Sequence, residues 1–210
     1  MEEKKESLEK GWEDYLKRLK QKISNKLVVV FGQPLVGKTT LAIELSKLYR
    51  KTFYFEIDTN LKEVSFPENV QKIPIPDYKF LLRNLKPDDF IQKAVPDTLI
   101  VVDSITTLAS QFQEDKLFSP RKQLELANFY DIVFRKFSEM VKRSKEVTAI
   151  IISHEALKEF PDKIAPRMNL LALRHADLVL RVYRENGTRK VKIWEERNTN
   201  PKEVKFFIEV

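Results

Sequence analysis

One stretch of the chain combines two glycines, a lysine and two threonines at a spacing that suits phosphate binding. Its residues match the Walker A pattern and are Gly32, Gln33, Pro34, Leu35, Val36, Gly37, Lys38, Thr39 and Thr40. In such a loop the main-chain amides converge on phosphate groups, and the lysine lies against the β- and γ-phosphates of a nucleoside triphosphate. We therefore predict a catalytic role for Lys38 and a Mg²⁺ ligand in Thr39. The alternative is an ordinary glycine turn with an exposed lysine.

An aspartate at the end of an apolar run supplies the second part of such a site. Leu99 to Val102 is entirely aliphatic and is followed by Asp103, and open α/β sheets bind ligands at the carboxyl ends of their strands. We expect Asp103 to hold Mg²⁺ through water, because Mg²⁺ keeps most of its hydration shell. An aspartate after a strand is by itself more often a turn former, so this Walker B assignment depends on the glycine loop.

The elements that must position these residues follow from hydrophobic patterning. Short continuous apolar runs predict buried strands, and a period of three to four residues predicts helices. The predicted strands are 27–31, 53–57, 98–102 and 147–153, and the predicted helices are 39–50 and 124–145. Their alternation predicts an α/β fold with a mostly parallel sheet and helices on both faces. We expect 65–96 to be mostly connection, with at most one short helix.

The two ends of the chain have different patterns. Residues 2–26 carry an apolar stripe at helical spacing, formed by Leu8, Trp12, Leu16, Leu19 and Ile23. This N-terminal amphipathic helix, assigned to 1–26, either packs against the 27–210 core or serves as a docking arm for another subunit. Near the C-terminus, Asn186-Gly187 predicts a hairpin turn, and an antiparallel meander is expected from 177–184, 190–194 and 204–210.

Composition limits the classes of protein that are possible. The 210 residues are 42% hydrophobic and 33% charged, which excludes wholesale disorder and a bilayer-embedded chain. The charged first ten residues lack the apolar stretch of a secretory signal, so we expect a cytoplasmic protein. No cysteine and two histidines are present, which nearly excludes a metal cluster. The net charge of +7 favours a polyanionic partner, and few glycines with many Lys and Glu fit a thermophile.

Together these motifs resemble the RecA/RadA recombinase family, in particular the archaeal RadA paralogues of the RadB and RadC kind that consist of the ATPase core alone. The resemblance spans 27–210 and rests on the Walker A loop, on 99–108 with its Asp-Ser pair, on Ser153-His154-Glu155 and on the terminal meander, where Val191–Ile208 looks like the family's last hairpin. It implies a RecA-like P-loop NTPase fold, binding of ATP and Mg²⁺, single-stranded DNA as a partner, and a role in homologous recombination or DNA repair. A recombinase partner and homo-oligomers are further implications.

Two positions depart from the family pattern. Where the family carries a catalytic glutamate after its second strand, this chain has Asn60, and an amide cannot act as a general base. Because this base is missing, we expect slow hydrolysis. Glu56 or Asp58 could substitute, although strand alternation puts both on one face and does not distinguish which of them points at phosphate. Glu155 stands where recombinases carry a glutamine that senses the γ-phosphate. Circadian-clock-type RecA relatives are similar to this chain in having a glutamate there. A carboxylate there would repel phosphate unless a cation intervenes.

Two segments match the positions of the family's DNA loops. Residues 156–175 contain no glycine and carry four basic residues as candidate phosphate contacts, namely Lys158, Lys163, Arg167 and Arg174. Residues 111–122 match the first DNA loop and contain Phe112 and Phe118. In both cases the alternative is a solvated surface.

Several other residues have two interpretations. Arg167, Arg174, Arg181 and Arg184 are candidates for an arginine finger offered to a neighbouring subunit, or are simply charged surface. His154 and His175 are expected to be hydrogen-bonded structural groups. Glu195 matches the residue with which recombinases cap the neighbour's ATP, although a solvent-facing strand residue would look the same.

Three functions are compatible with this sequence. The first is a weak, DNA-dependent ATPase that binds single-stranded DNA and modulates recombination. The second is a nucleotide-gated regulatory or scaffold protein that binds ATP without useful turnover and contacts a recombinase or another partner. The third is a small-molecule kinase, which the antiparallel meander disfavours.

Overall fold

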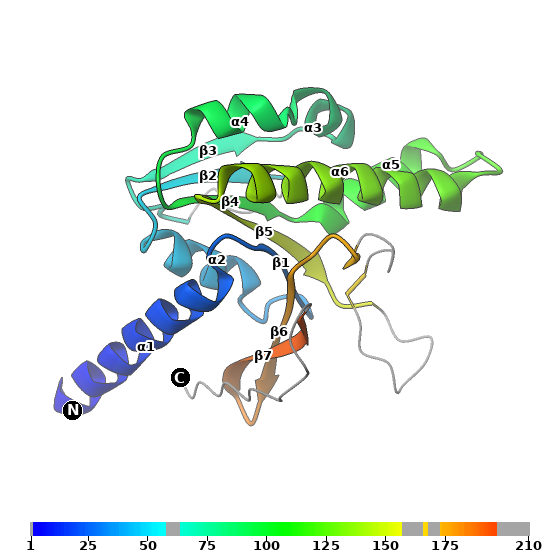
Figure 1. Ribbon diagram of the computed structural model, residues 1–210. Helices are drawn as coiled ribbons and strands as arrows, with labels where there is room; N and C mark the ends of the chain where they lie inside the picture. The colour runs from blue at the N-terminus through cyan, green and yellow to red at the C-terminus, as the bar shows by residue number, and fades with distance from the viewer. Residues whose placement is uncertain (1, 58–63, 157–165, 168–172, 197–210) are drawn as a thin grey trace.

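A seven-stranded sheet organises the structure, a computed structural model that describes residues 2–57, 64–156, 166–167 and 173–196 (Figure 1). Its strand order is β3-β2-β4-β5-β1-β6-β7. The strands are β1 (Leu27–Gly32), β2 (Lys51–Glu56), β3 (Val70–Pro74), β4 (Thr98–Asp103), β5 (Val147–His154), β6 (Leu178–Glu185) and β7 (Thr188–Glu196). The helices are α1 (Glu2–Ile23), α2 (Lys38–Ser46), α3 (Tyr78–Asn84), α4 (Pro87–Lys93), α5 (Ile105–Asp115) and α6 (Lys122–Ser144).

The pairing of the strands confirms the predicted α/β class. β1 to β6 pair in parallel with their neighbours, and only β7 runs antiparallel, beside β6. Parallel strands bring their carboxyl ends to one edge of the sheet, where ligands bind in this class of fold. The predicted third strand of the meander, 204–210, lies outside the described residues.

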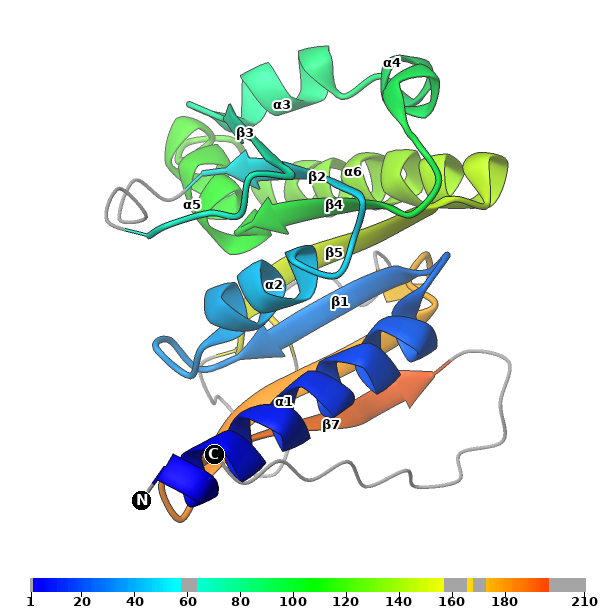
Figure 2. The same cartoon turned by 90° about the vertical axis from the view of Figure 1, so that its left-hand side faces the viewer.

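Helices cover both faces of the sheet, as Figure 2 shows with α1 and α2 in front of the strands and α5 and α6 behind them. Side chains of β1 alternate between the two layers: Val29 and Phe31 join the core under α3, α5 and α6, whereas Val28 and Val30 join the core under α1 and α2. Because both faces are buried, the central strands are continuously apolar, which is the pattern that made them recognisable in the sequence.

The apolar stripe of α1 packs against the sheet from its middle onwards. Leu16, Leu19 and Ile23 are buried in the same core as Val28 of β1. Lys20 adds an ion pair, with its Nζ 2.5 Å from Oδ2 of Asp97. These contacts favour the packing interpretation for the second half of the helix. The division of the chain at residue 26 stays a prediction.

We expect Leu16→Ala to destabilise the protein. The side chain is 4% exposed, and removal of a buried leucine side chain costs about 2 to 5 kcal/mol through lost burial and the resulting cavity. Urea denaturation should show a lower midpoint at an unchanged slope. Lys17→Ala on the exposed face is the control, and equal stability of the two variants would mean that α1 does not contribute to the core.

The prediction for 65–96 was wrong, because this segment contains β3, α3 and α4 rather than mainly connection. β3 extends the sheet by pairing with β2. Asp77 caps α3 by accepting a hydrogen bond from the Phe80 amide at 2.6 Å, and Pro87 occupies the first turn of α4, where proline is tolerated. The prolines therefore flank short elements, and each element is too short to show a clear period.

The match of 111–122 to a DNA loop also needs correction. Residues 111–115 belong to α5, Lys122 begins α6, and only the turn between them is irregular. Phe112 is 7% exposed and stacks on Phe129 in the core, so it is unavailable for base stacking. Phe118 is 95% exposed at the turn.

Candidate nucleotide-binding site

The glycine loop joins β1 directly to α2 at the carboxyl edge of the sheet. Gly32 ends β1, and a Cβ at this position would lie 2.1 Å from the carbonyl oxygen of Val182 on β6, so the close approach of β6 requires glycine. Gly37 precedes α2 with φ of 94°, which a residue with a side chain adopts only at a cost. The loop amides and the positive end of the α2 dipole therefore meet at one point.

Lys38 lies inside this loop. Its side chain is nearly fully buried, and its Nζ donates hydrogen bonds to the carbonyl oxygens of Gly32 at 3.0 Å and Gln33 at 2.7 Å. Burial lowers the pKa of Lys38 to about 8, although the carboxylates of Asp103 and Glu155 oppose that shift. The ammonium is thus already largely stripped of water where phosphates are expected to bind.

Thr39 and Asp103 meet, as the Walker assignments predict. The Thr39 hydroxyl donates to Oδ2 of Asp103 at 2.6 Å. The same oxygen accepts a hydrogen bond of 2.7 Å from the hydroxyl of Tyr54, and burial together with Asp103 raises the pKa of Tyr54, which keeps it a donor. A hydroxyl and a carboxylate oxygen in contact beside the loop are the hard ligands that Mg²⁺ prefers, so these residues fit the metal.

Of the two residues that could replace the missing catalytic base, the structure describes Glu56. It ends β2 as the register partner of Asp103 on β4, which brings it to the ligand-binding edge of the sheet. Its carboxylate is paired with Lys72 of β3, with Nζ 3.1 Å from Oε2. Asp58 and Asn60 lie outside the described residues.

Glu155 has a cationic partner within its own chain. Oε2 of Glu155 lies 3.1 Å from Nη2 of Arg181 on β6, and the two side chains are only 7% and 14% exposed. Arg181 therefore compensates the charge of the Glu155 carboxylate within the same chain.

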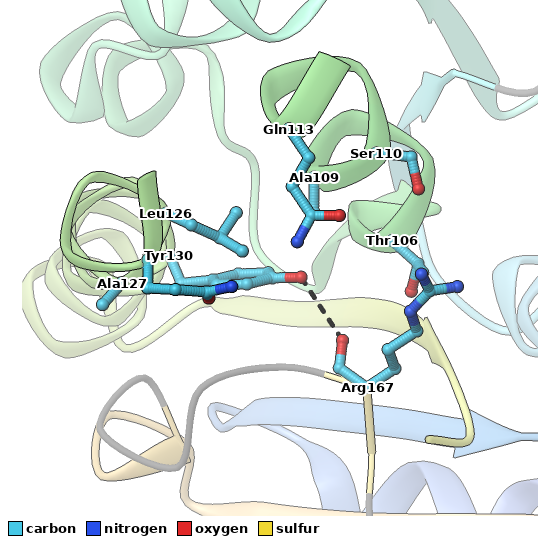
Figure 3. A pocket seen from close by; sticks show the side chains of 9 residues that line it. Thr106, Ala109, Ser110, Gln113, Leu126, Ala127, Tyr130 and Arg167 are labelled. Atoms are coloured by element: carbon cyan, nitrogen blue, oxygen red, sulfur yellow. Dashed lines mark hydrogen bonds between the residues drawn. The ribbon is translucent and has the colours of Figure 1, made fainter. Parts of the chain in front are cut away.

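Arg167 lies beside a separate cavity of about 260 Å³ between α5 and α6 (Figure 3). The Tyr130 hydroxyl donates to the Arg167 carbonyl at 3.3 Å, and the Arg167 amide donates to the His154 carbonyl at 2.7 Å. The His154 amide in turn donates to Oγ1 of Thr106 at 2.9 Å. Main-chain contacts therefore connect Arg167 to the end of β5, next to Glu155.

Arg174, another of the predicted DNA contacts, pairs with an acidic residue of α6. Arg174 and His175 both contact Oδ1 of Asp131, at 2.9 and 2.8 Å, and these contacts lower the pKa of Asp131. The predicted structural role of His175 agrees with this geometry. Lys158 and Lys163 lie outside the described residues, as does the side chain of Glu195.

Sequence reasoning missed three contributors to the site: Tyr54, the partnership of Arg181 with Glu155, and Arg189. A Cβ at Gly37 would lie 2.3 Å from Cζ of Arg189, so this guanidinium packs against the glycine loop. The available signal was alternation along β7, because Val191 and Ile193 belong to the core under α1 and α2 and Arg189 shares their face.

The strand order and the helices on both faces of the sheet define a RecA-like α/β architecture. Among solved structures, the chain is similar to one described as a crystal structure of the RadB recombinase, with a TM-score of 0.60, 17% sequence identity, and coverage of 84% of this chain and 83% of that chain. This likeness confirms the predicted fold. No protein-family model and no curated protein matches the sequence. Within the described ranges, no helix is both long and apolar enough to cross a membrane.

Proposed function

We propose that the protein binds a magnesium complex of a nucleoside triphosphate, with ATP as the expected nucleotide, in the loop between β1 and α2. The observation that carries this proposal is the contact between Thr39 and Asp103 at 2.6 Å, formed beside a buried Lys38. A glycine turn with an exposed lysine would bring neither the hydroxyl to the carboxylate nor the ammonium into the loop.

Each residue then has a defined task. The main-chain N–H groups from Gly32 to Thr40, except at Pro34, which has none, bind the phosphates, and Lys38 supplies a positive charge to the β- and γ-phosphates. Thr39 and Asp103 would hold Mg²⁺, which when bound neutralises charge on the phosphate oxygens. Tyr54 fixes the orientation of Asp103 through its 2.7 Å hydrogen bond.

We further propose a weak, DNA-dependent ATPase that binds single-stranded DNA and acts in recombination or repair. The RecA-like fold and the structural neighbour described as a recombinase support this proposal. Arg167 and Arg174, with Lys158 and Lys163, are the proposed phosphate contacts for DNA. Arg167 is exposed and linked to the end of β5, which would couple DNA contact to the Glu155 region.

A nucleotide-gated regulator without useful turnover is the second candidate. Two ion pairs favour this candidate. The possible catalytic carboxylates that the structure describes are each paired with a cation, Glu56 with Lys72 and Glu155 with Arg181. A carboxylate oxygen that contacts a cation of its own chain is less available to accept a hydrogen bond from an attacking water. In this case nucleotide binding alone would control contact with a recombinase or another partner, or assembly of copies of this chain.

Phosphate release from Mg-ATP, measured with and without single-stranded DNA, separates the two candidates. Stimulation by DNA supports the ATPase. Binding of ATP with no phosphate release in either condition supports the regulator. For the ATPase we also expect DNA affinity to fall steeply between about 50 and 200 mM salt, because phosphate contacts release counterions. Salt-independent binding would rule out phosphate contacts by the basic residues.

A further inference from the structure

The start of β7 brings a guanidinium onto the phosphate-binding loop. A Cβ built at Gly37 would lie 2.3 Å from Cζ, 2.5 Å from Nε and 2.6 Å from Nη2 of Arg189. The whole planar group of Arg189 therefore lies against the main chain of the residue that precedes Lys38. A side chain at position 37 would displace this guanidinium from the loop.

The hairpin between β6 and β7 explains how this side chain reaches the loop. β6 runs parallel to β1, so the turn at Asn186 and Gly187 lies at the same edge of the sheet as the glycine loop. Arg189 is among the first residues of β7 after that turn and shares a face with Val191. Because this face packs on α1 and α2, Arg189 is directed toward the N-terminus of α2.

One donor of Arg189 lacks an acceptor. Among the described residues, Nε is buried and makes no hydrogen bond to the protein. Buried donors are nearly always paired in folded proteins, and an unpaired one is unfavourable. A guanidinium suits the oxygens of phosphate because its donors form a planar fork.

We propose that Arg189 binds the phosphate chain of the nucleotide from within the same subunit. This inference rests on the proposed function of the loop and adds a residue to it. The positive end of α2, Lys38 and Arg189 would then surround the phosphates, and Nε would gain its missing acceptor. The ligand class is a nucleoside di- or triphosphate, because a chain of at least two phosphates is needed to contact both the loop amides and Arg189.

Calorimetric titration of the full-length protein with Mg-ATP and Mg-ADP tests the inference. We expect Arg189→Gln to weaken binding of both nucleotides about ten- to hundredfold, as for loss of a charged hydrogen bond. Arg189→Lys should recover part of the affinity, because it keeps the charge and loses the fork. Lys192→Gln is the matched control: it removes one positive charge from the same strand at an exposed position whose Nζ lies over the Tyr183 ring at 6.0 Å, and it should bind within about twofold of the parent.

Each outcome decides the question. If the parent binds Mg-ATP and Arg189→Gln binds equally well, Arg189 only packs against the loop and the inference is wrong, while the proposed function stands. If the parent itself binds no nucleotide, the proposed function fails first. Should Arg189→Gln not fold by circular dichroism, Arg189→Lys decides: affinity equal to the parent overturns the inference, and a loss of several-fold, with Lys192→Gln unchanged, supports it.

Discussion

Replacing Lys38 with alanine is expected to abolish saturable binding of Mg-ATP, with a loss of at least about a hundredfold in affinity. The reason is the environment of the ammonium. Its side chain is 6% exposed, and it is held by carbonyls of the loop itself. Much of the desolvation cost is therefore met in the folded protein, so a phosphate gains the attraction of a poorly solvated charge.

The fold should survive this substitution. Burial disfavours the charged form of Lys38, as its lowered pKa of about 8 indicates, so its removal relieves a cost as well as deleting two hydrogen bonds. Calorimetry measures the affinity, and thermal unfolding followed by circular dichroism checks the structure. Lys47→Ala, at the exposed end of the same helix where Nζ pairs with Glu44 at 2.7 Å, is the matched control and should bind normally. Normal binding by Lys38→Ala would place the nucleotide elsewhere.

Arg181→Gln is expected to weaken Mg-ATP binding about tenfold or more and to destabilise the protein. The Glu155 side chain would be left at 7% exposure with its guanidinium partner removed. Truncating one member of such a pair costs about 2 to 4 kcal/mol, since these groups retain slight contact with water. The uncompensated carboxylate, close enough to influence Lys38, would also repel the phosphates.

The Glu155→Gln/Arg181→Gln double variant should recover most of the affinity and stability. With the carboxylate replaced by an amide, no charge is left uncompensated, and the cycle of single and double variants isolates the coupling of the pair. Arg184→Gln, on the exposed part of β6, is the control for loss of positive charge. If Arg181→Gln and the double variant bind equally weakly, Arg181 acts through its own charge and not through Glu155.

The central strands and the glycine loop were predictable because their signals are local. β1, β4 and β5 are buried on both faces, so their apolar runs are continuous. The loop requires glycine, lysine and threonine at fixed spacing, and the hydroxyl of Thr39 in this pattern contacts Asp103. α5 was not assigned, although its N-cap is a local signal too: the Ser104 side chain accepts from the Thr107 amide.

The charged partners of the site were not predictable in the same way. Glu155 directly follows β5 and Arg181 lies on β6. Both strands border β1, so the pairing of the two residues depends on the strand order of the sheet. Tyr54 reaches Asp103 only because β2 and β4 are adjacent. Arg189 depends on the register of the last hairpin. Contacts of this kind arise from tertiary arrangement, which leaves no periodic trace in the residues themselves.

Titration of the pure, full-length protein with Mg-ATP by calorimetry tests the nucleotide site most directly. The geometry of Lys38, Thr39 and Asp103 predicts saturation at one nucleotide per chain, and weaker binding when EDTA removes Mg²⁺. Absence of both heat and saturation at millimolar Mg-ATP, with the protein folded, would contradict the existence of a nucleotide site between β1 and α2.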